Sequence, residues 1–142
     1  MNTFDSLCDY FEGLGLDTLH ELERYYATDT WFKDPFHEVR GVEAVRAILR
    51  HTFIKLPDAR FHIGRRFSDA DRHGVILWEM RFTMPLTRQP SCIKGASHIE
   101  FDGDGKVIAH RDYWDAAEEL YGRLPVLNWL MRALAHQAAA KL

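Results

Sequence analysis

The chain has 142 residues, a formal net charge of −3 at neutral pH and a pI near 6.2, with 8 histidines. This charge carries no basic excess, so the composition argues against a nucleic-acid-binding protein. A chain of 142 residues fits one domain, residues 1–142, which can bury a core without disulfides or a structural metal.

The cysteines and the N-terminus bear on the compartment. Cys8 and Cys92 form neither a disulfide framework nor a zinc-ligand spacing, and we expect a reducing environment. The N-terminus is acidic and lacks the apolar segment of a signal peptide, and no apolar run approaches the ~18 residues that cross a bilayer. The sequence therefore predicts a cytoplasmic protein that binds neither nucleic acid nor a membrane.

Three helices are predicted in the first half of the chain, because apolar residues recur there at helical spacing. The first covers about residues 4–13. The second takes Asp17 as its N-cap and runs through Tyr26. The third follows Gly41 and is ended by Pro57.

A short strand is predicted between the second and third helices, around residues 28–32. Its β-branched and aromatic residues favour extended backbone, and Pro35 ends it because proline has no N–H to donate. The residue before a proline is held out of the helical region, so Asp34 is fixed at the strand end. That position suits a working carboxylate, and it equally suits an ordinary turn.

The second half alternates apolar and polar residues, which is typical of strands, around residues 59–63, 76–84, 91–101 and 106–114. Turn residues separate these runs, and the sequence DGDG at 102–105 is the strongest hairpin signal. The pattern predicts an antiparallel meander.

Pairing Phe101 with Lys106 across that turn predicts the faces of the last hairpin. In this register Ser97 lies opposite His110. The mostly apolar inner wall is then Ile93, Gly95, Ser97, Ile99, Phe101, Ile108, His110, Asp112 and Trp114, with Ile99 opposite Ile108 and Ile93 opposite Trp114. The outer face carries Lys94, His98, Glu100, Arg111 and Tyr113.

Residues 116–142 return to helical spacing and form a predicted C-terminal helical extension. Pro125 divides it into a short helix to Arg123 and a second helix from about Pro125 to Ala140. The second helix carries an apolar stripe of Leu127, Leu130, Met131 and Leu134. Such a stripe needs a partner surface, so we expect a homodimer formed through the sheet.

The order of these elements resembles a known family. Three motifs carry the resemblance: YATDTWFKDPF, the helix led by Gly41, and SHIEFDGDGKVIAHRDYWD. Together they resemble the nuclear transport factor 2-like fold of ketosteroid isomerases and SnoaL-like polyketide cyclases. The resemblance implies a cone-shaped α+β domain in which N-terminal helices pack on a curved antiparallel sheet. The C-terminal extension goes beyond the small isomerases.

The resemblance also implies site residues. Asp34, in its Asp-Pro-Phe setting, matches the isomerases' proton-shuttling aspartate, and Tyr10 falls on their oxyanion-holding tyrosine. Their second oxyanion donor, a protonated carboxylic acid, falls on Ser97, whose hydroxyl is a weaker donor. Trp114 matches their pocket tryptophan.

Each candidate also has a structural interpretation. Asp34 is a proton shuttle or a turn acceptor, and Tyr10 is an oxyanion donor or a core residue with a satisfied hydroxyl. His110 and Asp112 are a base and its orienting carboxylate, or a buried pair that satisfies itself. The predicted ligand pocket comprises Phe32, Trp78, Met80, Phe82, Ser97 and Trp114.

The sequence predicts neither a metal site nor a cofactor. HELER and HEVRG lack the second histidine of a zinc-protease helix, GLGLDT lacks the third glycine of a dinucleotide fingerprint, and His98 and His110 fall on opposite faces. The leading hypothesis is an acid/base enzyme, of isomerase, cyclase or dehydratase type, acting on a small hydrophobic carbonyl compound. The alternatives are a non-catalytic ligand-binding module and a dimeric interaction domain, and the volume of the pocket discriminates between them.

Overall fold

The computed structural model describes residues 3–69, 72–119 and 125–140 of the chain. The elements in chain order are α1 (Thr3–Glu12), the 3₁₀ helix η1 (Leu16–Arg24), β1 (Tyr26–Lys33), β2 (Glu38–Arg40), α2 (Val42–Lys55), β3 (Arg60–Ser68), β4 (His73–Thr83), β5 (Pro90–Phe101), β6 (Val107–Tyr113), α3 (Ala116–Glu119) and α4 (Pro125–Ala138). No helix in the described ranges is long and apolar enough to cross a bilayer.

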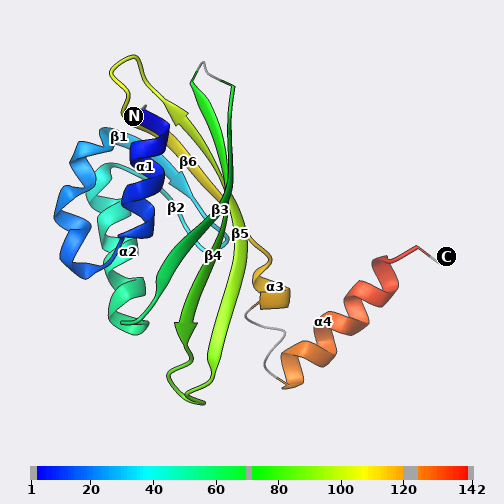
Figure 1. Cartoon of the computed structure of the whole chain (residues 1–142). Coiled ribbons are helices and arrows are strands. Elements are labelled where there is room, and N and C mark those ends of the chain that lie inside the picture. The colour runs from blue at the N-terminus through cyan, green and yellow to red at the C-terminus, as the bar shows by residue number, and fades with distance from the viewer. Residues whose placement is uncertain (1–2, 70–71, 120–124, 141–142) are drawn as a thin grey trace.

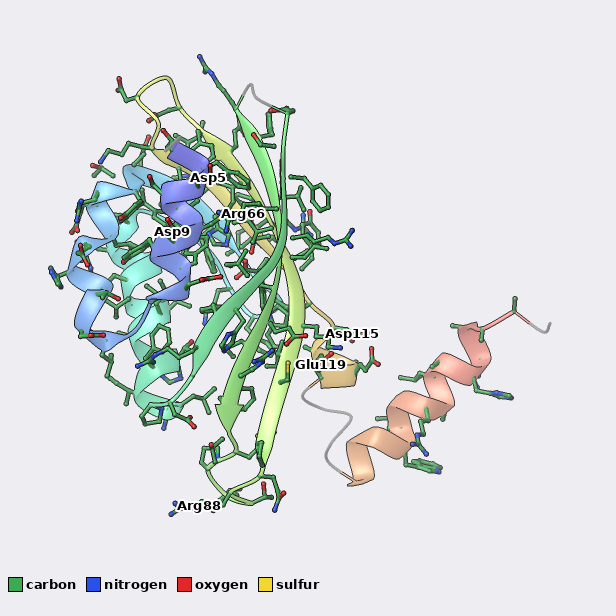
Figure 2. The ribbon with its side chains drawn as sticks, viewed as in Figure 1. Asp5, Asp9, Arg66, Arg88, Asp115 and Glu119 are labelled. Atoms are coloured by element: carbon green, nitrogen blue, oxygen red, sulfur yellow. The ribbon has the colours of Figure 1, made fainter. Side chains whose placement is uncertain are left out.

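The helices α1 and α2 cover one face of a curved sheet, and α3 and α4 lie on the opposite side (Figure 1). The predicted α+β architecture is therefore confirmed. Apolar residues of α1 face the sheet, among them Leu7 and Cys8, and an ion pair of 3.2 Å joins Asp5 of α1 to Arg66 of β3 (Figure 2).

The second helix differs from its prediction in type and in both ends. It begins at Leu16, so Asp17 lies in its first turn and is not its N-cap. The hydroxyl of Thr18 donates to the Gly13 carbonyl at 3.0 Å and accepts the Gly15 N–H at 3.0 Å, which holds the tight start of this 3₁₀ segment. The helix ends before Tyr26, which is already the first residue of β1.

The sheet has the strand order β2-β1-β6-β5-β4-β3. The meander β3-β4-β5-β6 is antiparallel as predicted, whereas β1 joins β6 in parallel, so the sheet is mixed. The short strand β2, which was not predicted, pairs with β1. This parallel pairing places β1, the first strand of the chain, beside β6, the last strand.

The last hairpin pairs two residues out of the predicted register. Ser97 lies opposite Asp112, and Ile99 lies opposite His110. Phe101 pairs with Val107, one residue beyond the predicted Lys106, and a bulge between Glu100 and Phe101 adds the second residue of the shift. The turn is held by the Asp102 carboxylate, which accepts the N–H groups of Asp104 and Lys106 at 2.9 Å each. Because a shift of two residues preserves the side of the sheet, Ser97, His110 and Asp112 still face inward.

Three details of the predicted hairpin are corrected by this register. The bulge buries Val107 completely, and Ile108 is half-buried. Trp114 follows the end of β6, so the predicted pairing of Ile93 with Trp114 does not form. Ile93 pairs with Met80 of β4.

The core lies between the helices and the inner face of the sheet, and large side chains fill it. Trp78 of β4 lies across Gly95 of β5, where a Cβ atom would come within 2.5 Å of the indole ring. The edge of Phe61 meets the same indole at 5.4 Å between ring centroids. Glycine at position 95 therefore makes room for the largest side chain of the inner wall.

Candidate functional site

A chain of hydrogen bonds crosses the inner face of the sheet from β1 to β4. The Tyr26 hydroxyl lies 2.6 Å from His110 Nδ1, and His110 Nε2 lies 2.6 Å from Asp112 Oδ1. Ser97 Oγ donates to the same carboxylate oxygen at 2.5 Å and accepts the Trp78 indole N–H at 2.8 Å. Five polar groups from β1, β4, β5 and β6 thus form one connected network.

The direction of these hydrogen bonds follows from Asp112. A carboxylate oxygen accepts, so His110 Nε2–H donates to Asp112 Oδ1. With its proton on Nε2, the imidazole offers Nδ1 as an acceptor, and the Tyr26 hydroxyl donates to it. Burial, and secondarily the Asp112 carboxylate, raise the pKa of Tyr26 well above its ordinary value, which keeps this donor protonated.

Aromatic rings hold the His110 imidazole in place. Phe32 meets it edge-on at 5.0 Å between ring centroids, Tyr26 stacks on it at 5.9 Å, and Phe11 lies at 5.8 Å. With both nitrogens hydrogen-bonded and the ring packed on several sides, His110 orients its neighbour and has no nitrogen left for a ligand.

Asp112 is the member of this network that reaches open space. Its side chain is 18% exposed, compared with 9% for His110. Both hydrogen bonds that described residues donate to Asp112 end on Oδ1. The second oxygen, Oδ2, keeps its lone pairs for another partner.

On its inner side Asp112 borders a small enclosed cavity of about 30 Å³, lined by Phe11, Leu14, Tyr26, Phe32, Val45, Leu49, Phe61, Ile63, Trp78, Ser97, His110 and Asp112. Buried water needs a space of at least about 10–15 Å³ and polar partners, which Ser97 and Asp112 offer here. Drug-sized ligands occupy about 300–1,000 Å³, so the cavity fits water and not such a ligand.

On its outer side Asp112 borders a depression of about 540 Å³, which we call the notch, lined by Lys33, Asp34, Pro35, Arg111, Asp112, Tyr113, Trp114 and Asp115. The notch exists because β1 stops at Lys33, before Pro35, while β6 continues to Tyr113. Among the described residues, Asp112 alone borders both the enclosed cavity and the notch.

Asp34 acts as a turn acceptor in the structure. Its Oδ1 accepts the backbone N–H groups of Phe36 at 2.8 Å and His37 at 2.7 Å, and His37 Nδ1 lies 3.0 Å from the same oxygen. Asp34 lines the notch but not the enclosed cavity. These hydrogen bonds favour the interpretation of Asp34 as a turn acceptor, because the Asp-Pro turn holds its carboxylate at the rim of the notch.

Tyr10 is a packed residue of the helical layer. Its hydroxyl donates to the Thr18 carbonyl at 2.9 Å, and its ring stacks on Tyr25 at 4.3 Å between centroids. Burial raises the pKa of Tyr10 above its ordinary value. Tyr10 lines neither the enclosed cavity nor the notch, so the structure does not bring it together with Asp34 in one pocket.

The predicted pocket residues divide among three places. Phe32, Trp78 and Ser97 line the enclosed cavity. Trp114 lines the notch, where its ring meets Phe36 at 5.5 Å between centroids. Met80 and Phe82 are buried in the core and line neither space.

Tyr26 is the member of the hydrogen-bond network that the sequence did not indicate. It looked like the last apolar residue of a helix, and only the parallel pairing of β1 with β6 places its hydroxyl against His110. His98 is exposed on the outer face and His110 is buried on the inner face, as predicted. Within the described residues no group of three or more histidine, cysteine or acidic side chains could hold a metal ion.

Comparison with known proteins places this geometry in context. Residues 8–110 match the model of the SnoaL-like domain. A search of curated proteins gives no match. Many solved structures are similar, and the three described below share 15–17% sequence identity with this chain.

Three similar structures illustrate the range of proteins that share the fold. TsrD from Streptomyces laurentii has a TM-score of 0.72 at 15% identity, with 86% of this chain and 94% of that chain covered. An LEH-like epoxide hydrolase of M. tuberculosis has a TM-score of 0.69 at 17% identity, covering 92% and 96% of the two chains.

A hypothetical protein of Catenulispora acidiphila DSM 44928, with a ketosteroid isomerase-like fold and solved in complex with trimethylamine, has a TM-score of 0.70 at 15% identity over 80% and 88% of the two chains. At these identities the likeness concerns the fold, and it confirms the predicted nuclear transport factor 2-like architecture.

Proposed function

Because the chain belongs to the SnoaL-like domain family, we propose that it is an acid/base enzyme in which Asp112 moves a proton on a small carbonyl compound bound in the notch. The observation that carries the proposal is the position of Asp112 between a buried hydrogen-bond network and an open depression of ligand size. Asp112 takes the role that the family resemblance gave to Asp34.

The network prepares the Asp112 carboxylate for this role. His110 Nε2–H and the Ser97 hydroxyl both donate to Oδ1, which fixes the plane of the carboxylate and leaves Oδ2 for a substrate C–H. A general base must lie within hydrogen-bond reach of the proton that it removes, and Asp112 is one of the residues that line the notch. His110 and Tyr26 are positioning residues, because they act through Asp112.

The proposed step is proton transfer next to a carbonyl group. Asp112 takes a proton from the α-carbon, and the C–H electron pair passes into the enolate. The protonated carboxyl group then returns the proton to the α-carbon or, where the enolate is conjugated with a C=C bond, to the γ-carbon, which shifts the double bond. The products of such a step are those of an isomerase, and a cyclase or a dehydratase begins in the same way. Trp114 offers an apolar surface for the hydrophobic part of the substrate.

Exchange of α-protons for deuterium tests the proposal with a defined probe. We expect the protein to accelerate the loss of the α-proton NMR signals of 2-tetralone in D₂O. The variant Asp112→Asn should slow this exchange by about 10²–10⁴-fold, the usual contribution of a general base. Asp34→Asn is the matched control, because asparagine can still accept the two turn hydrogen bonds. Equal rates for the wild type and Asp112→Asn would overturn the assignment.

The filled core supports a second candidate, an interaction domain that takes no small-molecule ligand. Large side chains fill the cone and leave about 30 Å³, which is the outcome expected for an interaction domain of this fold. In that case 2-tetralone would neither shift the NMR signals of notch residues such as Trp114 nor exchange its α-protons faster. The two functions are therefore separated by the same sample.

A further inference from the structure

The outer side of the sheet carries the helix α4 (Figure 1) and a pair of histidine side chains. The side chains of Leu127 and Met131, which the sequence placed in the apolar stripe of α4, lie outside the described part of the chain. Both histidines are described. His73, at the start of β4, and His98 of β5 alternate with the buried residues of their strands, so both side chains are on the outer face.

The two imidazole rings bring two nitrogen atoms close together. Cross-strand pairing puts His73 opposite Glu100 and His98 opposite Val75, so the two histidines form a diagonal pair. His73 Nδ1 lies 3.0 Å from His98 Nε2, and the ring planes are within 6° of parallel. In the neutral pair one of these nitrogens carries the proton of a hydrogen bond and the other accepts it.

The same two nitrogens have the spacing of neighbouring ligands of a metal ion. A histidine nitrogen binds a transition metal at about 2.0–2.1 Å, so two nitrogens 3.0 Å apart subtend an angle of about 91–97° at the ion. A tetrahedral site would need about 3.3–3.4 Å between them. An angle near 90° belongs to tetragonal coordination, which is typical of Cu²⁺ and Ni²⁺. The spacing therefore favours these two ions over Zn²⁺.

We propose that His73 and His98 form a two-histidine chelate for a divalent transition-metal cation of the Cu²⁺ and Ni²⁺ class. The ion would lie about 1.4 Å to one side of the line that joins the two nitrogens. Small rotations of the rings turn both lone pairs toward that point, and the terminal torsion of a histidine side chain is broad enough to permit them. The proton of the hydrogen bond moves to the other nitrogen of its own ring, so both rings stay neutral and no net proton is released.

The surroundings of the pair are open and electrostatically balanced. His98 is exposed and His73 is half-buried, so water can fill the remaining positions around the ion. Within the described residues no third histidine, cysteine or acidic side chain completes a group with them. Glu100 stands opposite His73, and Arg111 stands opposite His98. The Arg111 guanidinium stacks at 4.6 Å on the ring of Tyr113, which lies two residues along β6 and away from Glu100.

The chelate is separate from the proposed site at Asp112. Neither His73 nor His98 lines the enclosed cavity or the notch, so the two proposals stand or fall independently. A bound ion would tie β4 to β5 where β4 begins, at the end of the sheet away from α3 (Figure 1). Because the two imidazoles are held together only in the folded chain, the ion binds the folded state more tightly and stabilises it.

Urea unfolding with and without millimolar Ni²⁺ tests the chelate. We expect Ni²⁺ to raise the urea midpoint of the wild type, and EDTA to reverse the rise. His73→Gln and His98→Gln each keep one imidazole and should lose the rise. The matched control His62→Gln, at an exposed histidine of β3, should keep it. Far-UV circular dichroism confirms that each variant is folded. No rise in the wild type, or an equal rise in His98→Gln, would overturn the proposal.

The number of bound imidazoles and the choice of metal test its geometry. Electron spin-echo envelope modulation with less than one equivalent of Cu²⁺ should show two imidazoles in a Cys92→Ser background, which removes the half-buried thiol that Cu²⁺ can oxidise. Adding His98→Gln should leave one. At equal concentrations Ni²⁺ should raise the urea midpoint more than Zn²⁺ does. A single imidazole before the histidine is changed, or a larger effect of Zn²⁺, would overturn the assignment.

Discussion

Asp112 Oδ1 lies 2.6 Å from His110 Nε2, and the two residues are two positions apart on β6. Alternate residues of a strand point to the same side, so one strand face supplies both the carboxylate and the group that orients it. Tyr26, on the neighbouring strand β1, fixes the far side of the imidazole. The relationship therefore depends on the β1–β6 pairing as much as on β6 itself.

The Tyr26 hydroxyl is predicted to stabilise the fold through His110. Tyr26→Phe leaves the buried Nδ1 of His110 without its donor, and the free energy of unfolding should fall by about 1–3 kcal/mol. Urea unfolding at pH 7 measures this change. Nitrogen-15 NMR of the wild-type imidazole should show the proton on Nε2. A proton on Nδ1 would contradict the assigned direction of the hydrogen bonds.

Stability is predicted to fall at alkaline pH because of the same phenol. The folded state holds the Tyr26 pKa above its ordinary value, so the contribution of this group is complete below the unfolded pKa of about 10. As the pH rises further, the unfolded chain releases the proton and the folded chain retains it, and the contribution is lost.

Urea titrations between pH 9 and 11.5 compare this loss among variants. Tyr26→Phe should lose less stability with rising pH than the wild type does. Tyr10→Phe should also flatten the profile, since burial raises the Tyr10 pKa as well. Parallel profiles for Tyr26→Phe and the wild type would show that Tyr26 does not contribute.

Gly95 is predicted to be intolerant of a side chain. A Cβ atom at this position would lie 2.5 Å from the Trp78 ring, so Gly95→Ala should cost about 1–3 kcal/mol through overpacking. The double variant Gly95→Ala/Trp78→Leu should lose less stability than the sum of the losses in the two single variants, because a smaller side chain at position 78 makes room for the methyl group. Additive costs in chemical unfolding would contradict the contact.

Thr30→Val is predicted to raise stability. The Thr30 side chain is fully buried on β1, and its hydroxyl has no hydrogen-bond partner among the described residues. Valine keeps the shape and the β-branch while it removes the unpaired hydroxyl, so a gain of about 1–3 kcal/mol is expected. Thr28→Val, at an exposed position of the same strand, is the control and should change little. A loss of stability in Thr30→Val would indicate a partner such as buried water.

Asp34→Ala is predicted to destabilise the turn after β1. The carboxylate accepts two backbone N–H groups, and hydrogen bonds to a charged group contribute about 1.5–3 kcal/mol. Thermal or urea unfolding of Asp34→Ala and Asp34→Asn gives the comparison, and the asparagine variant should retain most of the stability. If both variants match the wild type, the turn does not depend on residue 34.

The sequence indicated the side of the sheet for the site but not its pairing. Alternation along β5 and β6 placed Ser97, His110 and Asp112 on one inner face, because parity is a property of each strand alone. The two-residue shift in register combines the pairing of Phe101 with Val107 and a bulge between Glu100 and Phe101, and a hydrophobic pattern indicates neither of them.

The other differences between the predicted site and the structure concern Tyr26 and Asp34, and each has its own cause. Tyr26 meets His110 only through a parallel pairing of strands separated by most of the chain. The Asp34 carboxylate accepts two backbone N–H groups of its own turn and does not line the inner cavity. A match to a short sequence motif gives no information on which of these two positions the side chain takes.

Because β1 ends early, Asp112 borders the small cavity on the inner face of the sheet and the notch at once. A small residue at position 112 would join the enclosed cavity to the notch and open the cone from the side. The size of the ligands that this fold admits could then be changed at a single position on β6, without any change in the strands that form the cone.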